Sequence, residues 1–321
     1  FSNRHRYLAN HKYSQTVESG SDEMEVERTE LDCLLENVGN MSLDEVPIVD
    51  VQMDAPEAAA TEEEEERDQL LLVIGEHIQM YRAQRALYQQ KVGEVIEDAK
   101  GGVGFEDRHH TFVVDYGQNM ELPVFNAEQP GATYYYSPMT VNNLGMVNHA
   151  HKYPDGKVSE HVHCHVYTDA VGRKGANNVA SLIIKTLRHL NILHDNSVGS
   201  ELNIVFDNCT GQNKNNTVLR LAAWLAQLGY FLEINFIFLV VGHTKKAADR
   251  LFNLLKQEYR KKNLYTFNQL VEALSVSHTI TVHPTMAEDF FNYAKLFDFF
   301  YRKLAGQIQQ NHIFSSGFRP G

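Results

Sequence analysis

The sequence has little cysteine and no long hydrophobic run. Its three cysteines, Cys33, Cys164 and Cys209, lie far apart and form no CxxC pair. We therefore expect neither a disulfide framework nor a structural zinc site built on cysteines, and a reducing compartment is the default environment. No stretch approaches the ~20 apolar residues that a membrane-spanning helix needs. These absences predict a nuclear or cytoplasmic protein that is neither secreted nor held in a membrane.

Basic residues are scarce in the N-terminal part of the chain. The first 100 residues hold 23 Asp and Glu against 9 Lys and Arg, whereas residues 101–321 hold 18 against 20. The net charge of −12 therefore arises in the N-terminal part, and the rest is about neutral, which permits a basic groove for nucleic acid. The chain begins at Phe1 without a signal-peptide pattern, so we interpret it as a fragment.

The first two segments differ in hydrophobic pattern. Residues 1–67 are rich in acidic and small polar residues and bury too little apolar surface to offset the entropy of ordering, so we expect a disordered acidic tail or linker. Binding of this tail to another protein is the alternative. Residues 68–100 carry apolar side chains at three-, four- and seven-residue steps, which predicts one long helix. We expect this helix to pack on the following domain, with formation of a homodimer as the alternative.

Residues 101–275 change to an alternating pattern. The predicted strands span residues 111–115, 133–147, 161–168, 201–206 and 232–241, and the predicted helices span residues 177–190, 215–228 and 247–262. A three-strand meander followed by alternating helices and strands predicts an α/β domain with a mixed sheet and helices on both faces. Residues 276–321 are expected to be a C-terminal helical extension whose aromatic residues serve core packing.

Three acidic residues occupy the ends of predicted elements. Asp115 follows the apolar run of residues 112–114 at the end of the first strand, Asp207 ends the strand ELNIVF, and Asp249 lies in the first turn of the helix over 247–262. Strand ends in such a sheet converge on one edge, where three carboxylates would repel one another without a cation. Mg²⁺ or Mn²⁺, as a pair of ions, suits such ligands and supports phosphodiester cleavage or strand transfer. The pattern therefore predicts a catalytic metal site.

Other interpretations of these acids remain open. Each Asp taken alone also fits an N-cap or a turn. Glu258 competes with Asp249 as the third acid, but it lies nine residues further on and hence about half a rotation away on the helix. Asp169, after the third strand, is either an auxiliary carboxylate or a turn residue.

Two polar segments beside these acids are candidates for holding a nucleic-acid backbone or phosphate. The candidate residues are Asn208, Gln212, Asn213 and Lys214 after the second acid, and His243, Lys245, Lys246 and Arg250 around the third. Amides, free N–H groups and cationic side chains are the usual partners of phosphate oxygens. Capping of the next helix and a solvated helix face are the alternative roles.

Three histidines, His161, His163 and His165, alternate along the third predicted strand and therefore share one face. Side chains at such spacing on a flat strand converge poorly on a single ion. We therefore favour a structural hydrogen-bonding role over a metal site.

Four segments carry a resemblance to a known family. VVDYGQNMELP, KGANNVAS, VFDNCTGQNKNN and VVGHTKKAADRLF resemble the signature blocks of an uncharacterised domain family found in transposon-derived proteins of many eukaryotes. That family is similar to the ribonuclease H-like core of DDE transposases. The resemblance runs from about Ile78 to about Ser275. It implies a ribonuclease H-like fold, a divalent-metal site at the three acids, and DNA as the partner.

The resemblance leaves two functions open. A metal-dependent nuclease or transposase is the first, and a domesticated, non-catalytic module that binds nucleic acid or protein is the second. The third acid, Asp249, departs from the pattern of a typical DDE enzyme, in which Glu is commoner at that place.

Overall fold

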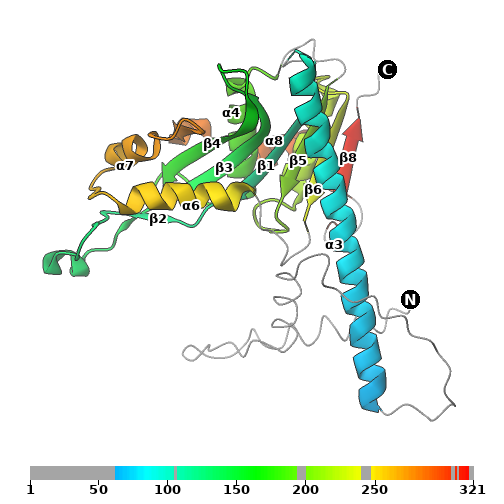
Figure 1. Cartoon of the computed structure of the whole chain (residues 1–321), viewed down its shortest axis with the longest axis horizontal. Coiled ribbons are helices and arrows are strands. Elements are labelled where there is room, and N and C mark those ends of the chain that lie inside the picture. Colours follow the sequence, from blue (N-terminus) through cyan, green and yellow to red (C-terminus); the bar gives the residue numbers. More distant parts are fainter. Residues whose placement is uncertain are drawn as a thin grey trace. The chain divides into compact units, whose positions relative to one another are not determined.

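The computed structural model describes residues 62–104, 107–193, 200–239, 247–304, 308 and 311–317. The side chains of residues 62–64, 132, 247–251, 254 and 258 are outside this description. Within the described part, the chain is an α/β structure with an eight-stranded mixed sheet and six α-helices (Figure 1). The predicted acidic tail lies outside the described residues as far as residue 61.

The elements follow one another in the predicted alternation. The strands are β1 (His110–Tyr116), β2 (Met120–Leu122), β3 (Met139–Lys152), β4 (Val158–Thr168), β5 (Glu201–Phe206), β6 (Glu233–Phe238), β7 (Ile280–Pro284) and β8 (Ile313–Gly317). The α-helices are α3 (Glu62–Gly101), α4 (Ala176–His189), α5 (Asn216–Gln227), α6 (Ala247–Arg260), α7 (Phe267–Leu274) and α8 (Tyr293–Phe300). Two short 3₁₀ helices are η1 (Gly131–Tyr135) and η2 (Ala287–Asp289).

The sheet has the order β7-β4-β3-β1-β5-β6-β8, and β2 pairs with β3 beside this path. Strands β1, β3 and β4 form an antiparallel meander, whereas β5 pairs parallel to β1 and β6 pairs parallel to β5. Strand β7 adds parallel to β4 at one edge, and β8 adds antiparallel to β6 at the other. This topology confirms the predicted mixed sheet.

Helices cover both faces of the sheet, as predicted. On one side, which we call the α4 face, α4, α5 and α8 pack over sheet residues such as Phe112 and Val114. On the other, the α6 face, α3, α6 and α7 pack over residues such as Val113 and Val205. Successive side chains of a strand point to opposite faces. The central strand β1 therefore contributes to both cores with fully buried side chains, as the near-continuous apolar sequences of the inner strands predict.

The long helix α3 packs on the sheet through its C-terminal half, as expected from its apolar spacing. Val95 and Ala99 are buried against β3 and β4, and Lys91 Nζ lies 2.8 Å from Glu201 Oε1 at the start of β5. The side chains of Leu70, Leu71, Leu72 and Val73, near its N-terminal end, are exposed. The helix begins at Glu62, several residues before the predicted start. No helix in the described ranges has the length and apolar character required to cross a membrane.

The largest differences from the prediction concern residues 131–139 and 276–321. Residues 131–135 form η1, and the strand predicted over 133–147 begins only at Met139, because Pro138 has no N–H to donate to a strand ladder. Residues 276–321, expected to be helical, contain α8 but also β7 and β8, which pair with the two edges of the sheet. Such pairing depends on partners far away in the sequence, so local periodicity does not reveal it.

Gly145 marks a close approach between the sheet and α6. It pairs with Asp115 across β1 and β3, and a Cβ atom at this position would lie 2.9 Å from Phe252 Cζ. We expect Gly145→Ala to lower the free energy of unfolding by about 1–3 kcal/mol, because the Phe252 ring would have to shift within a packed core. Urea denaturation measures this change. The matched control is Gly131→Ala, where a Cβ meets no atom within 4 Å; equal stability of the two variants would contradict the prediction.

Candidate functional site

The first two predicted acids lie side by side. Parallel pairing of β1 and β5 sets Val113 opposite Val205. Asp115 lies two residues further along β1, and Asp207, the first residue after β5, lies two residues beyond Val205. Neighbouring strands are about 4.8 Å apart, and residues two positions apart share a face. Both carboxylates therefore leave the sheet on the α6 face, at the carboxyl ends of adjacent strands, and both residues are half-buried.

The third predicted acid lies on the helix that covers this face. Asp249 falls in the first turn of α6, but its side chain is outside the described residues, as is that of Glu258. Phe252, three residues beyond Asp249, is buried in the core of the α6 face and contacts the backbone at Gly145, the pairing partner of Asp115. The N-terminal half of α6 therefore lies over the strand end that carries the first acid.

The amide-rich loop after β5 is held together by its own hydrogen bonds. Asn213 Nδ2 donates a short hydrogen bond to Asp207 Oδ1, and the Cys209 backbone N–H donates to the same oxygen at 3.4 Å. The Asn215 side chain caps α5 by accepting hydrogen bonds from two backbone amides of its first turn. The capping alternative therefore applies to Asn215, while Asn213 orients the second acid.

The structure describes only some of the other residues that were predicted to bind a nucleic-acid backbone. Lys214 has a fully buried side chain whose Nζ lies 5.8 Å from the centroid of the Phe238 ring, so it supports the loop from inside. Two buried amide oxygens, Asn208 Oδ1 and Asn213 Oδ1, accept no hydrogen bond from the described protein groups. Gln212 is partly exposed beside them. The predicted residues His243, Lys245 and Lys246, and the side chain of Arg250, lie outside the described residues.

Lys174 is a charged neighbour of the site that the sequence reasoning did not single out. Its Nζ donates a 3.0 Å hydrogen bond to Gly117 O and lies 5.0 Å from the centroid of the Tyr116 ring. Burial lowers the pKa of the Lys174 ammonium, and the nearby charge of Asp115 partly opposes this lowering. The only sequence signal was its position in the KGANNVAS segment.

The three alternating histidines of β4 lie on the α4 face, opposite the carboxylates. His165 Nε2 lies 2.7 Å from Thr186 Oγ1 of α4, and His161 Nε2 lies 2.8 Å from Thr281 Oγ1 of β7. These contacts agree with the favoured structural role for His161 and His165. Burial and the neighbouring imidazoles lower the pKa of His161 to about 4 and that of His163 to about 2.

The low pKa values of the histidines on β4 and β7, which we call the histidine row, predict that the protein is less stable in mild acid. Burial also lowers the pKa of His283 to about 4, whereas an unfolded histidine titrates near pH 6.5. Between these values the unfolded chain binds more protons than the folded chain, so the free energy of unfolding falls as the pH falls through this window. We expect urea midpoints, measured with a chelator present, to decrease from about pH 6.5 to about pH 5, with a shallower slope for His161→Gln. A flat profile in the wild type would contradict the prediction.

The chain was also compared with known proteins. Neither the search of curated proteins nor the search of solved structures gave a match. A family model described as "Domain of unknown function (DUF7869)" matches residues 134–317. The matched segment runs from η1 to β8 and so contains β5 with its amide-rich loop, α6 and the histidine row, whereas Asp115 precedes it. Since the match covers more than half of the chain, the protein belongs to the DUF7869 family of domains of unknown function.

Proposed function

We propose that this chain is a ribonuclease H-like, transposase-derived core that cleaves or transfers phosphodiester bonds of DNA in the nucleus. In this proposal Asp115, Asp207 and Asp249 hold two Mg²⁺ or Mn²⁺ ions. The observation that supports it is the register of β1 and β5, which pairs Val113 with Val205, each two residues before one of the acids Asp115 and Asp207.

The order of elements supports the same proposal. An antiparallel meander of β1, β3 and β4 leads through α4 to β5, and through α5 to β6, with β5 parallel to β1. This is the meander followed by alternation that we expect of a ribonuclease H-like core. It puts the first acid at the end of the first strand and the second at the end of the first strand after the meander. The helix after β6 carries the third.

The donor atoms at this edge fit a hard divalent cation. Mg²⁺ and Mn²⁺ prefer carboxylate and carbonyl oxygens. Beside the two carboxylates, the loop after β5 buries the amide oxygens of Asn208 and Asn213 without a hydrogen-bond donor among the described protein groups. When bound, such ions activate a water or a 3′-hydroxyl and stabilise the charge on the leaving oxygen.

The protein side chains around the acids have their own tasks in this proposal. The hydrogen bond from Asn213 fixes one Asp207 oxygen, and the other accepts no hydrogen bond from the described groups. The ammonium of Lys174 reduces the repulsion between Asp115 and its acidic neighbour, and its position at the same edge suits contact with a phosphate oxygen. Both groups orient or balance charge and need not take part in bond breaking.

The same contacts favour a second candidate function. Asp207 already accepts hydrogen bonds from its own loop, and Asp115 lies near a lysine. Carboxylates with such partners can be structural without any metal. A domesticated module that binds nucleic acid or protein, without catalysis, is therefore the alternative.

Cleavage of supercoiled and linear DNA by the full chain in the presence of Mn²⁺ tests the first function. We expect Asp207→Asn to reduce the cleavage rate at least about 100-fold, because metal ions supply several kcal/mol of transition-state stabilisation and about 1.4 kcal/mol corresponds to tenfold. Asp155→Asn is the matched control, since Asp155 lies in the exposed turn between β3 and β4. Equal rates for the wild type and Asp207→Asn would assign any cleavage to a contaminant.

Binding of Mn²⁺, followed by electron paramagnetic resonance, tests the metal site without a choice of substrate. We expect saturable binding by the wild type and Asp155→Asn, and strongly weakened binding by Asp115→Asn and Asp207→Asn, each of which removes one anionic ligand. Thermal unfolding checks that the variants are folded. Identical weak binding by all four proteins would favour the non-catalytic module.

A further inference from the structure

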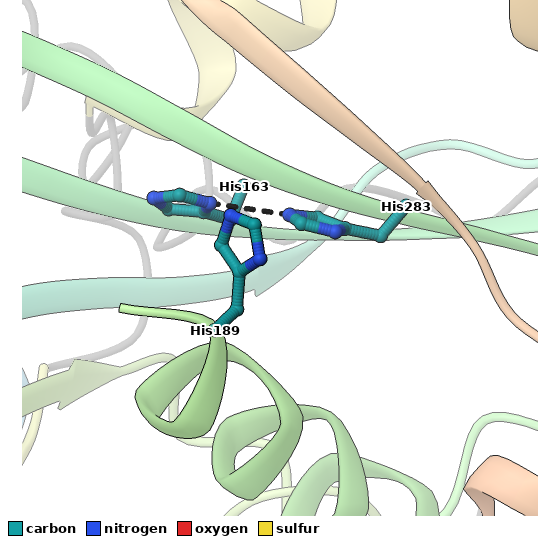
Figure 2. A group of neighbouring side chains, drawn as sticks. All are labelled: His163, His189 and His283. Atoms are coloured by element: carbon teal, nitrogen blue, oxygen red, sulfur yellow. Dashed lines mark hydrogen bonds between the residues drawn. The ribbon is translucent and has the colours of Figure 1, made fainter. Parts of the chain in front are cut away.

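A second group of potential metal ligands lies on the α4 face. His163 of β4, His189 at the end of α4 and His283 of β7 each offer one ring nitrogen, and these three atoms lie within 4.8 Å of one another. His163 Nδ1 and His283 Nε2 share a hydrogen bond of 3.2 Å, so their ring nitrogens already face each other. Figure 2 shows the His189 ring rising from the helix end toward the gap between the other two rings. Three different elements thus converge on one point.

The fold explains this convergence. Parallel pairing of β4 with β7 sets His165 opposite His283, so His163 is the diagonal neighbour of His283 on the same face. His189 is the last residue of α4, the helix that packs over this part of the sheet. Strand β4 therefore supplies one ligand, and its neighbours β7 and α4 supply one each. The objection that alternating histidines of one strand converge poorly therefore does not apply to this set.

Two of the three rings are withdrawn from water, because His163 is buried and His283 is half-buried. The second nitrogen of His163, Nε2, is buried without a hydrogen-bond partner among the described groups. A metal ion on Nδ1 would place the proton of this imidazole on Nε2.

The distances suit tetrahedral coordination. Zn–N bonds of about 2.0–2.1 Å at tetrahedral angles separate two ligand nitrogens by roughly 3.3–3.4 Å. The separation of His163 Nδ1 and His283 Nε2, 3.2 Å, is close to that value. His189 is exposed, so rotation of its side chain is free to close the remaining gap. The same exposure leaves room for a water molecule at a fourth position.

The ammonium group of Lys185 is a positive charge near the three histidines. Lys185 lies one turn before His189 on α4, and its charge contributes to the low pKa values of His165 and His283. Its Nζ is 2.6 Å from Asp289 Oδ2, which balances that charge locally. The pair also ties α4 to η2, just after β7, and so helps to hold the helix end above the strand.

We propose that His163, His189 and His283 form a site for Zn²⁺, with water as the fourth ligand. Imidazole nitrogen favours zinc and its transition-metal neighbours over Mg²⁺, Ca²⁺ and Mn²⁺. The ion would link β4, the edge strand β7 and the C-terminus of α4. This inference is independent of the proposed nuclease function, because the carboxylates lie on the opposite face of the sheet.

Zinc titration of the tag-free full chain, stripped with a chelator and dialysed, tests the site. We expect one tightly bound Zn²⁺ per chain that millimolar Mg²⁺ does not displace, with any zinc at the carboxylates bound more weakly, and visible absorption bands of tetrahedral Co²⁺ when cobalt replaces zinc. His189→Ala should abolish these bands. It should weaken zinc binding by more than the roughly 10- to 100-fold that loss of an outer-shell partner costs. Because this side chain is exposed, the variant should fold, and circular dichroism checks that it does.

The control variants separate this site from others. His278→Ala removes an exposed histidine near the same edge, and Asp207→Asn removes a carboxylate of the opposite face. Both variants should keep the tight zinc site and the cobalt bands of the wild type. A second ligand variant, His283→Gln, should behave like His189→Ala. The proposal is overturned if wild type and His189→Ala bind zinc equally, or if His278→Ala loses the ion instead. Loss of zinc binding in Asp207→Asn would assign the ion to the carboxylates and also overturn it.

Discussion

The parallel pairing of β1 with β5 is the interaction on which the candidate active site depends. Side chains alternate along a strand, so a shift of one residue would send one of the two acids to the opposite face. The hydrophobic cores prevent such a shift, because Phe112 and Ile204 must stay on the α4 face while Val113 and Val205 stay on the α6 face. The packing of the apolar residues just before the acids therefore determines which side of the sheet receives the carboxylates.

The two faces of the same sheet carry two different kinds of donor. Oxygen donors gather at the carboxyl ends of β1 and β5 on the α6 face, whereas imidazoles gather between β4, β7 and α4 on the other. Hard cations favour the first set and zinc favours the second. Strand pairing keeps the two sets on opposite faces. Asp115 pairs with Gly145, and Gly145 pairs with Cys164, so these three residues share the α6 face. His163 is the next residue along β4 and therefore points to the α4 face.

Much of the fold could be predicted from local pattern, and much of the site could not. Apolar runs and helical spacing gave the inner strands, the long helix and the mixed sheet. The edge strands β7 and β8 were not predicted, because the strands with which they pair are distant in the sequence. Asp115 and Asp207 could be singled out because the first closes the apolar run of β1 and the second directly follows β5. Lys174 and the convergence of His163 with His189 and His283 depend on tertiary packing of separate elements, which spacing along one strand does not encode.

The most direct test of the central claim is an anomalous difference map from crystals of the full chain soaked in Mn²⁺. The account predicts density roughly 2.1 Å from carboxylate oxygens of both Asp115 and Asp207, with Asp249 facing the same ions. Carboxylates that point apart, with no density at the carboxyl ends of β1 and β5, would contradict it.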